Sequence, residues 1–126
     1  MTTPPAGRKT PLVVDDDEAT RGGLTLLLSH SRYAVTPART GEAALALLRD
    51  GLRPDLVLLD MPALLSDGRH LVELLRQAGP CAAVPLVVVA ASALGRDWAA
   101  AIGCAGFIGK PAEPGARLEE VRRCLG

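Results

Sequence analysis

The chain has 126 residues, of which 48% are hydrophobic, and it carries 14 basic and 14 acidic residues. This composition is typical of one globular domain with a substantial core and excludes a disordered chain. A net charge near zero and only one Trp, one Tyr and one Phe argue against direct nucleic-acid binding.

The N-terminal segment has no apolar core of the kind that signal peptides carry. The longest apolar run, residues 81–91, contains Pro85 and is too short to cross a bilayer. We therefore expect no membrane insertion, a flexible lead-in over residues 1–10 and a single domain over residues 11–126. The three cysteines have no metal-like spacing, which favours reduced thiols in a cytoplasmic protein.

Short apolar runs alternate along the chain with segments of helical periodicity. The runs predict strands at residues 11–14, 33–38, 55–60, 84–91 and 106–110. The intervening segments predict helices around residues 24–28, from Thr40 to Gly51, over about 68–78 and 97–102, and through 118–125. Pro37 places the second strand at a sheet edge or marks the end of that strand.

This alternation predicts an α/β fold, a doubly wound five-stranded parallel sheet of the flavodoxin-like class with helices on both faces. In such sheets, ligands bind at the carboxyl ends of the strands. The first strand ends at Asp15, Asp16 and Asp17, the third at Asp60 and the fifth at Lys110. These side chains are expected to meet at one edge of the sheet.

Gathered carboxylates repel each other unless a cation neutralises them, and Mg²⁺ suits a site with few carboxylates and open positions for phosphate oxygens. Lys110 adds a point charge suited to a phosphoryl oxygen. The chemistry indicated is phosphoryl transfer onto an aspartate, in which metal and lysine neutralise the transferring group. For any one of these residues, the plain alternative is the start of a solvated loop.

The order of "VVDD" at 13–16, "GEAALALL" at 41–48, "DLVLLD" at 55–60, "DG" at 67–68 and "KP" at 110–111 resembles the receiver domain of bacterial two-component response regulators. The resemblance covers about residues 11–125 and implies the strand order 2-1-3-4-5. It implies a phosphorelay protein and not an enzyme. The implied partners are a histidine kinase or a histidine phosphotransfer protein, with a possible homodimer through the fourth helix, fifth strand and fifth helix.

The resemblance also implies roles for individual residues. Asp60 is the phospho-acceptor, and Lys110 contacts the phosphoryl group. Asp16 is a direct Mg²⁺ ligand, and Asp15 acts through water or by hydrogen bonding. The backbone carbonyl of Pro62 is the third protein ligand of the metal. Asp17 is expected to cap the first helix instead.

Several positions depart from the family pattern and predict an atypical receiver. Ala90 stands where the family has a Ser or Thr whose hydroxyl reports the phosphoryl group, and Ser92 could replace it only if the strand ran longer. Phe107 replaces the usual switch Tyr, and Ala112 replaces the usual Phe after Lys-Pro. The Met-Pro pair, with Pro62, lies two residues earlier than usual, which stiffens the metal loop.

The region of the fourth helix also departs from the family pattern. The segment between Ala90 and Gly103 is short, so we expect a short or irregular fourth helix, with Trp98 packing the core.

One alternative function is a protein–protein interaction module on the same fold that does not depend on phosphorylation. A remote alternative is a haloacid-dehalogenase-type phosphatase that uses Asp15. A flavodoxin is disfavoured because three aspartates would repel a phosphate.

Overall fold

The computed structural model describes residues 8–60, 65–77, 83–91 and 93–125. Within these residues, five strands alternate with five helices. The strands are β1 (Pro11–Val14), β2 (Thr36–Ala38), β3 (Leu56–Asp60), β4 (Leu86–Ala91) and β5 (Gly106–Lys110). The helices are α1 (Glu18–His30), α2 (Gly41–Arg49), α3 (Leu65–Gln77), α4 (Gly95–Ala101) and α5 (Pro114–Leu125).

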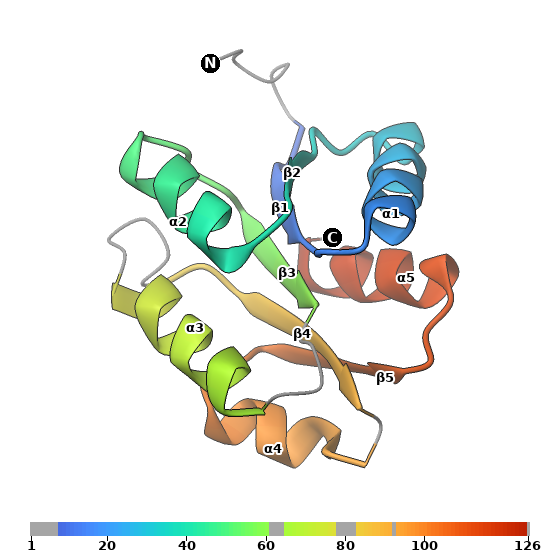
Figure 1. Ribbon diagram of the computed structural model, residues 1–126. Coiled ribbons are helices and arrows are strands. Elements are labelled where there is room, and N and C mark those ends of the chain that lie inside the picture. The colour runs from blue at the N-terminus through green and yellow to red at the C-terminus, as the bar shows by residue number, and fades with distance from the viewer. Residues whose placement is uncertain (1–7, 61–64, 78–82, 92, 126) are drawn as a thin grey trace.

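The strands form one parallel sheet in the order β2-β1-β3-β4-β5, which confirms the predicted α/β fold class and strand order (Figure 1). The register aligns Val14 with Leu59 and Asp60 with Val89, so β1 and β3 end at the same edge. Lys110 is aligned with Ala91 at the end of the neighbouring β4 strand. The topology therefore gathers the expected site residues at one edge.

Alternation along the central strands divides the core into two clusters. Leu12, Val57 and Val88 face α2, α3 and α4 on one side of the sheet. Val13 and Leu58 face α1 and α5 on the other side (Figure 1). Both faces of the central strands are thus buried, as the near-continuous apolar runs predicted.

Local signals place the ends of the first two helices. Asp17 lies just before the first residue of α1 and accepts a hydrogen bond from the backbone N–H of Thr20, which confirms its expected capping role. Thr40 caps α2 in the same way, accepting from Ala43. Gly51 follows α2 with φ of 112°, a conformation that glycine adopts without steric cost.

Several elements differ from their expected bounds. Strand β4 begins two residues later than expected, at Leu86, and helix α5 four residues earlier, at Pro114. The second strand covers only Thr36–Ala38, because Tyr33 and Val35 pack against the core outside the strand. Helix α3 begins at Leu65, three residues before its expected start at about residue 68, so Asp67 and Gly68 both lie in its first turn. Helix α4 has 7 residues and begins at Gly95, two residues early, but it is short as predicted, and Trp98 packs against the core. No helix within the described residues is long and apolar enough to span a membrane.

Candidate functional site at the carboxyl edge of the sheet

Asp60, the last residue of β3, lies in contact with Lys110 at the end of β5. Lys110 Nζ is 2.6 Å from Asp60 Oδ1, and the Asp60 side chain is only 12% exposed. Strands β3 and β5 are separated by β4, so the pair forms across the end of β4, where Asp60 is in register with Val89 and Lys110 with Ala91. The structure thus brings together the two residues that the sequence placed at the ends of the third and fifth strands.

A second cation reaches Asp60 from α5. Arg117 Nη2 lies 3.4 Å from Asp60 Oδ2, while its Nη1 donates to the carbonyl of Ala112 at 2.7 Å. Arg117 is buried, with 6% of its surface exposed. Each oxygen of the Asp60 carboxylate therefore faces a different cation, at a partly dry position where charge pairs interact more strongly than in water.

Asp15 is the most deeply buried carboxylate of this edge, at 3% exposure. Its Oδ1 accepts from the backbone N–H of Asp17 at 2.9 Å, and its Oδ2 is buried without a hydrogen-bond partner among the described residues. Burial raises the pKa of Asp15, the hydrogen bond from Asp17 and the charge of Arg117 oppose the rise, and the charge of Asp60 adds to it. A bound cation would lower the free-energy cost of keeping this carboxylate ionised with one oxygen buried and without a hydrogen bond.

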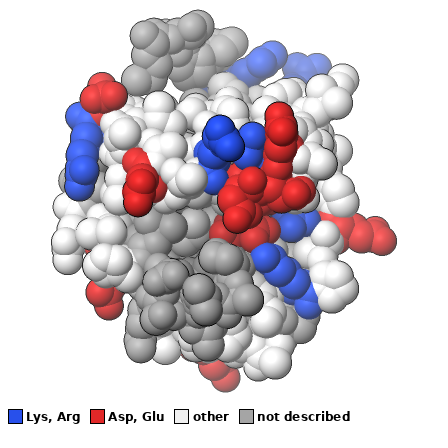
Figure 2. Space-filling view, viewed as in Figure 1, with Lys and Arg blue, Asp and Glu red and all other residues white. Residues whose placement is uncertain are grey.

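Asp16, by contrast, is exposed at the surface of the edge. Acidic side chains gather near the middle of the view in Figure 2, where the loop from β1 to α1 lies, and basic side chains border them. Arg21 is one of the basic residues of α1, and its Nη1 donates to the backbone carbonyl of Asp15 at 3.0 Å. The edge is therefore acidic at its centre and held by arginine and lysine at its rim.

The donor set at this edge fits a hard divalent cation only in part. Among the described residues, no group of three or more Asp, Glu, His or Cys side chains is arranged to hold a metal ion. The orphaned Oδ2 of Asp15 and the exposed carboxylate of Asp16 are oxygen donors of the type that Mg²⁺ accepts, together with waters and a backbone carbonyl. Pro62, whose carbonyl was the expected third ligand, lies outside the described residues, as does Ser92.

The expected switch positions lie on the opposite side of the sheet from Arg117. Ala90 is 2% exposed and Phe107 is 8% exposed, and both belong to the core cluster under α2, α3 and α4. Ala90 offers only a methyl group next to the edge, so the end of β4 supplies no side-chain hydroxyl within the described residues.

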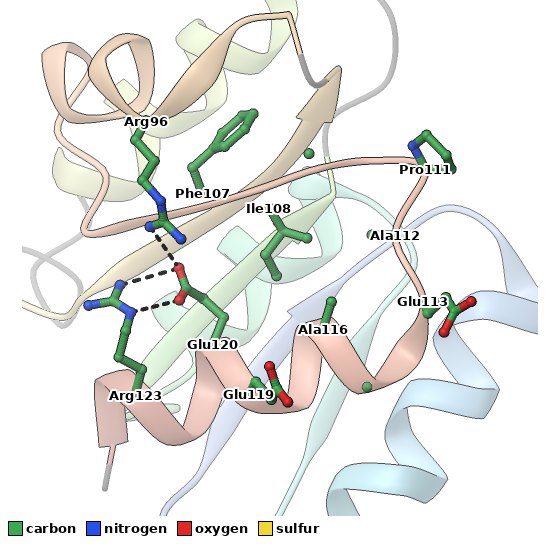
Figure 3. A pocket seen from close by; sticks show the side chains of 12 residues that line it. Arg96, Phe107, Ile108, Pro111, Ala112, Glu113, Ala116, Glu119, Glu120 and Arg123 are labelled. Atoms are coloured by element: carbon green, nitrogen blue, oxygen red, sulfur yellow. Dashed lines mark hydrogen bonds and ion pairs between the residues drawn. The ribbon is translucent and has the colours of Figure 1, made fainter.

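A wide hollow of about 850 Å³ lies between α4, β5 and α5, with Phe107 and Glu120 in its lining (Figure 3). Glu120 is buried and binds Arg123 at 2.6 Å and Arg96 of α4 at 3.4 Å. Burial alone would raise the pKa of Glu120, but the hydrogen bond and charge of Arg123, helped by Arg96, hold it below its ordinary value. The hollow runs along α5 as far as Pro111, next to Lys110, and lies on the face that the family resemblance implied for a homodimer.

Arg117 is the residue of the site that the sequence analysis missed. The signal was present, since Arg117 lies four residues before the buried Val121 and so shares its helix face. A charged residue on the core face of a helix needs a buried partner. The small Ala112, noted only as a departure, supplies the carbonyl that holds it.

The chain was compared with known proteins. The family model for the response regulator receiver domain matches residues 12–122. Among curated relatives, the polar-differentiation response regulator DivK of Brucella anthropi is 28% identical over 120 residues, covering 94% of this chain and 97% of its own length. The response regulator MprA of Mycobacterium sp. (strain KMS) is 40% identical over 80 residues, covering 64% of this chain; the match spans about a third of MprA, 34%.

Solved structures show the same relationship. The chemotaxis protein CheY4 of Vibrio cholerae superposes with a TM-score of 0.81 at 25% identity, covering 94% of this chain and 100% of its own. The receiver domain of the hybrid histidine kinase CckA superposes with a TM-score of 0.71 at 27% identity, covering 93% and 99% of the two chains. With the family match spanning nearly all of the fold, this chain belongs to the response regulator receiver domain family of two-component signalling proteins.

Proposed function

We propose that this receiver domain accepts a phosphoryl group on Asp60. The observation that carries the proposal is the 2.6 Å contact between Lys110 Nζ and Asp60 Oδ1 at the end of β3, beside the orphaned oxygen of Asp15. A carboxylate that a lysine positions, beside the unpartnered oxygen of Asp15, suits nucleophilic attack on phosphorus once a bound cation offsets the acidic charge. Membership of a signalling family favours this function over the phosphatase alternative built on Asp15.

The donor in the proposed reaction is a phosphohistidine of a histidine kinase or phosphotransfer protein. A carboxylate oxygen of Asp60 attacks the phosphorus, and the new O–P bond forms as the P–N bond to the imidazole breaks. The imidazole nitrogen keeps the bonding electron pair, and the ring, protonated on its other nitrogen, leaves neutral. Lys110 stays beside the acceptor and offsets the negative charge of the transferring oxygens.

We assign Mg²⁺ to the acidic edge, with Asp16 and Asp60 as direct ligands, the Pro62 carbonyl as a third, and Asp15 holding a bound water. When bound, the ion would neutralise the phosphoryl oxygens. Replacing Pro62 with Asn should change Mg²⁺ affinity and the dephosphorylation rate, because the ring fixes φ of the loop near about −65°. Equal values for both proteins would remove Pro62 from the assignment.

Incubation with acetyl phosphate and Mg²⁺, followed by intact-protein mass measurement, tests the acceptor. We expect one added phosphate on the wild type and none on Asp60→Asn. The matched control is Asp50→Asn, which removes an exposed carboxylate at the end of α2. Phosphate on the Asp60→Asn variant at the wild-type level, or none on the wild type, would contradict the proposal.

The output switch is proposed to be atypical. Ala90 has no hydroxyl that could bind a phosphoryl oxygen, and Phe107 lacks the hydroxyl of a tyrosine. We therefore expect a conformational change at Asp60 to reach α4 through β4 only weakly. Amide NMR shifts on addition of beryllofluoride should be large around Asp60 and small along α4. Large shifts throughout α4 would show that the link is intact.

A second candidate function is binding of a protein partner, or a second copy of this chain, at the α4–β5–α5 hollow without phosphorylation. The observation in its favour is the missing hydroxyl at Ala90 together with the preformed hollow around Phe107 and Glu120. Sedimentation velocity with and without beryllofluoride separates the candidates for the homodimer. Association that is equal in both conditions and unaffected by Asp60→Ala would favour the phosphorylation-independent module.

A further inference from the structure

Arg117 is a buried cation aimed at the acceptor from a helix. Its side chain is 7% exposed, and its guanidinium joins the Ala112 carbonyl to Asp60 Oδ2. The short side chain of Ala112 leaves a cavity of about 170 Å³ between α1 and the start of α5, lined in part by Gly23 and Arg117. A long side chain at position 112 would compete for the space beside the guanidinium.

The two contacts of Arg117 differ in length, so that its guanidinium can keep one and exchange the other for a new acceptor. The 2.7 Å bond to Ala112 is a tight anchor for Nη1, whereas Nη2 stands 3.4 Å from Asp60, near the long limit of a hydrogen bond. Lys110 already contacts the other oxygen of the same carboxylate. Asp60 therefore carries one negative charge between two cations, the half-exposed Lys110 and the buried Arg117. The guanidinium donors of an arginine also match phosphoryl oxygens better than an ammonium does.

We propose that Arg117 contacts the phosphoryl group on Asp60 and reports it to α5, in place of the hydroxyl that Ala90 lacks. This inference rests on the proposed phosphorylation of Asp60. Phosphorylation converts the carboxylate into an acyl phosphate and places terminal oxygens, with about two negative charges, at the acidic edge. Nη2 already lies 3.4 Å from Asp60 Oδ2, so it is within reach of a group attached to Asp60. A movement of the guanidinium toward that group would strain the hydrogen bond from Nη1 to the Ala112 carbonyl, in the connection between β5 and α5.

The route of the signal follows from which side of the sheet each residue occupies. Ala90 and Phe107 lie in the cluster beneath α2, α3 and α4. Arg117 lies on α5, which packs on the opposite cluster with α1. A phosphoryl contact made by Arg117 therefore acts on α5 directly and not through β4 and α4.

The test is a titration with beryllofluoride, a mimic of the phosphoryl group, at Mg²⁺ saturating for each protein. We expect Arg117→Met to bind about tenfold or more weakly, because a charge-assisted hydrogen bond is lost. Arg117→Lys, which keeps the charge but has a single donor nitrogen, should fall between. The matched control is Arg122→Met, which removes an exposed arginine from the same helix and should bind as the wild type does.

The wild type supplies a readout that does not depend on any variant folding. The ¹⁵N resonance of the Arg117 side chain should shift when beryllofluoride binds, and amide shifts should extend along α5 and disappear there in Arg117→Met. Wild-type binding with an unmoved Arg117 resonance, or equal affinity of Arg117→Met and Arg122→Met, would overturn the inference alone. Failure of the wild type to bind beryllofluoride or accept phosphate would overturn the proposed function and this inference together.

Discussion

Replacing Asp15 with Asn should stabilise the protein in the absence of metal. Asp15 is 3% exposed, and Oδ2 is buried without a partner, so the folded state carries an ionised group that is poorly solvated. Asparagine keeps the oxygen that accepts from the Asp17 N–H and removes the charge that opposes Asp60. The metal-binding role proposed for Asp15 therefore conflicts with the stability of the metal-free fold.

The size of the gain follows from the contacts that are missing. An unsatisfied buried polar atom costs about 1–3 kcal/mol, and more when it is charged. Because the Asn amide group also stands at the unpartnered position, we expect a gain near the lower end, about 1–1.5 kcal/mol. For a chain of this length, that corresponds to a rise in Tm of roughly 4–6 °C.

The stability gained by Asp15→Asn should also depend on pH. Burial raises the folded-state pKa of Asp15 above the ordinary value of 3.8, so the protonated carboxyl favours the folded state. That contribution is complete below pH 3.8 and is lost as pH rises through the folded pKa, which leaves the ionised group destabilising at neutral pH. The advantage of Asp15→Asn should therefore be largest at pH 7 and shrink toward pH 4.

Differential scanning calorimetry in chelator-treated buffer at pH 7 and pH 4 measures both effects. Asp16→Asn is the matched control, because it removes a neighbouring carboxylate that is exposed and should change metal-free stability little. Addition of Mg²⁺ should raise the Tm of the wild type more than that of either variant. A metal-free Tm of Asp15→Asn at or below the wild-type value at pH 7 would refute the argument.

Three other predictions concern positions outside the acid pair. Gly106→Ala should lower stability by about 1–3 kcal/mol in urea unfolding, because its Cβ would lie 2.6 Å from Glu120 Oε2, whereas Gly115→Ala meets nothing within 4 Å and should be neutral or slightly stabilising. Burial raises the pKa of Cys104 to about 11, so alkylation at pH 8 with peptide mapping should modify it more slowly than Cys124; equal rates would contradict its burial. Ala90→Ser should lengthen the lifetime of the aspartyl phosphate, and an unchanged lifetime would show that this position does not reach the phosphoryl group.

The fold could be predicted from the sequence because each strand carries its own signal. Continuous apolar runs such as Leu56–Leu59 match the burial of central parallel strands on both faces. The second strand was predicted over residues 33–38 but covers only Thr36–Ala38. Tyr33 and Val35 are residue types that favour strands, but here they pack against the core outside the strand. Periodicity indicates burial and does not report which backbone groups are paired.

The acidic edge was predictable for a different reason, which is that parallel topology forces strand ends together. Asp60 and Lys110 are 50 positions apart, yet one rule about strand ends brought them to the same place. The third charged partner came from within a helix, and no rule about strand ends reaches it. Arg117 could be found only by asking why a charge shares a helix face with Val121.

Helix α5 joins the two charged regions of the molecule, and this gives the proposed atypical switch a physical basis. Arg117 reaches from it into the acidic edge, and Glu120, three residues later, is buried at the α4–β5–α5 hollow. The Glu120–Arg96 contact to α4 is long, at 3.4 Å, and Arg96 is largely exposed, so a small movement of α5 would break or tighten that pair at little cost. A hydroxyl on β4 is thus not the only way to connect Asp60 with the α4–β5–α5 hollow. Helix α5 can connect them, because it carries a buried charge at the acidic edge and another at the hollow. Replacing Arg117 should therefore uncouple the hollow from Asp60, while Asp60 still accepts a phosphoryl group.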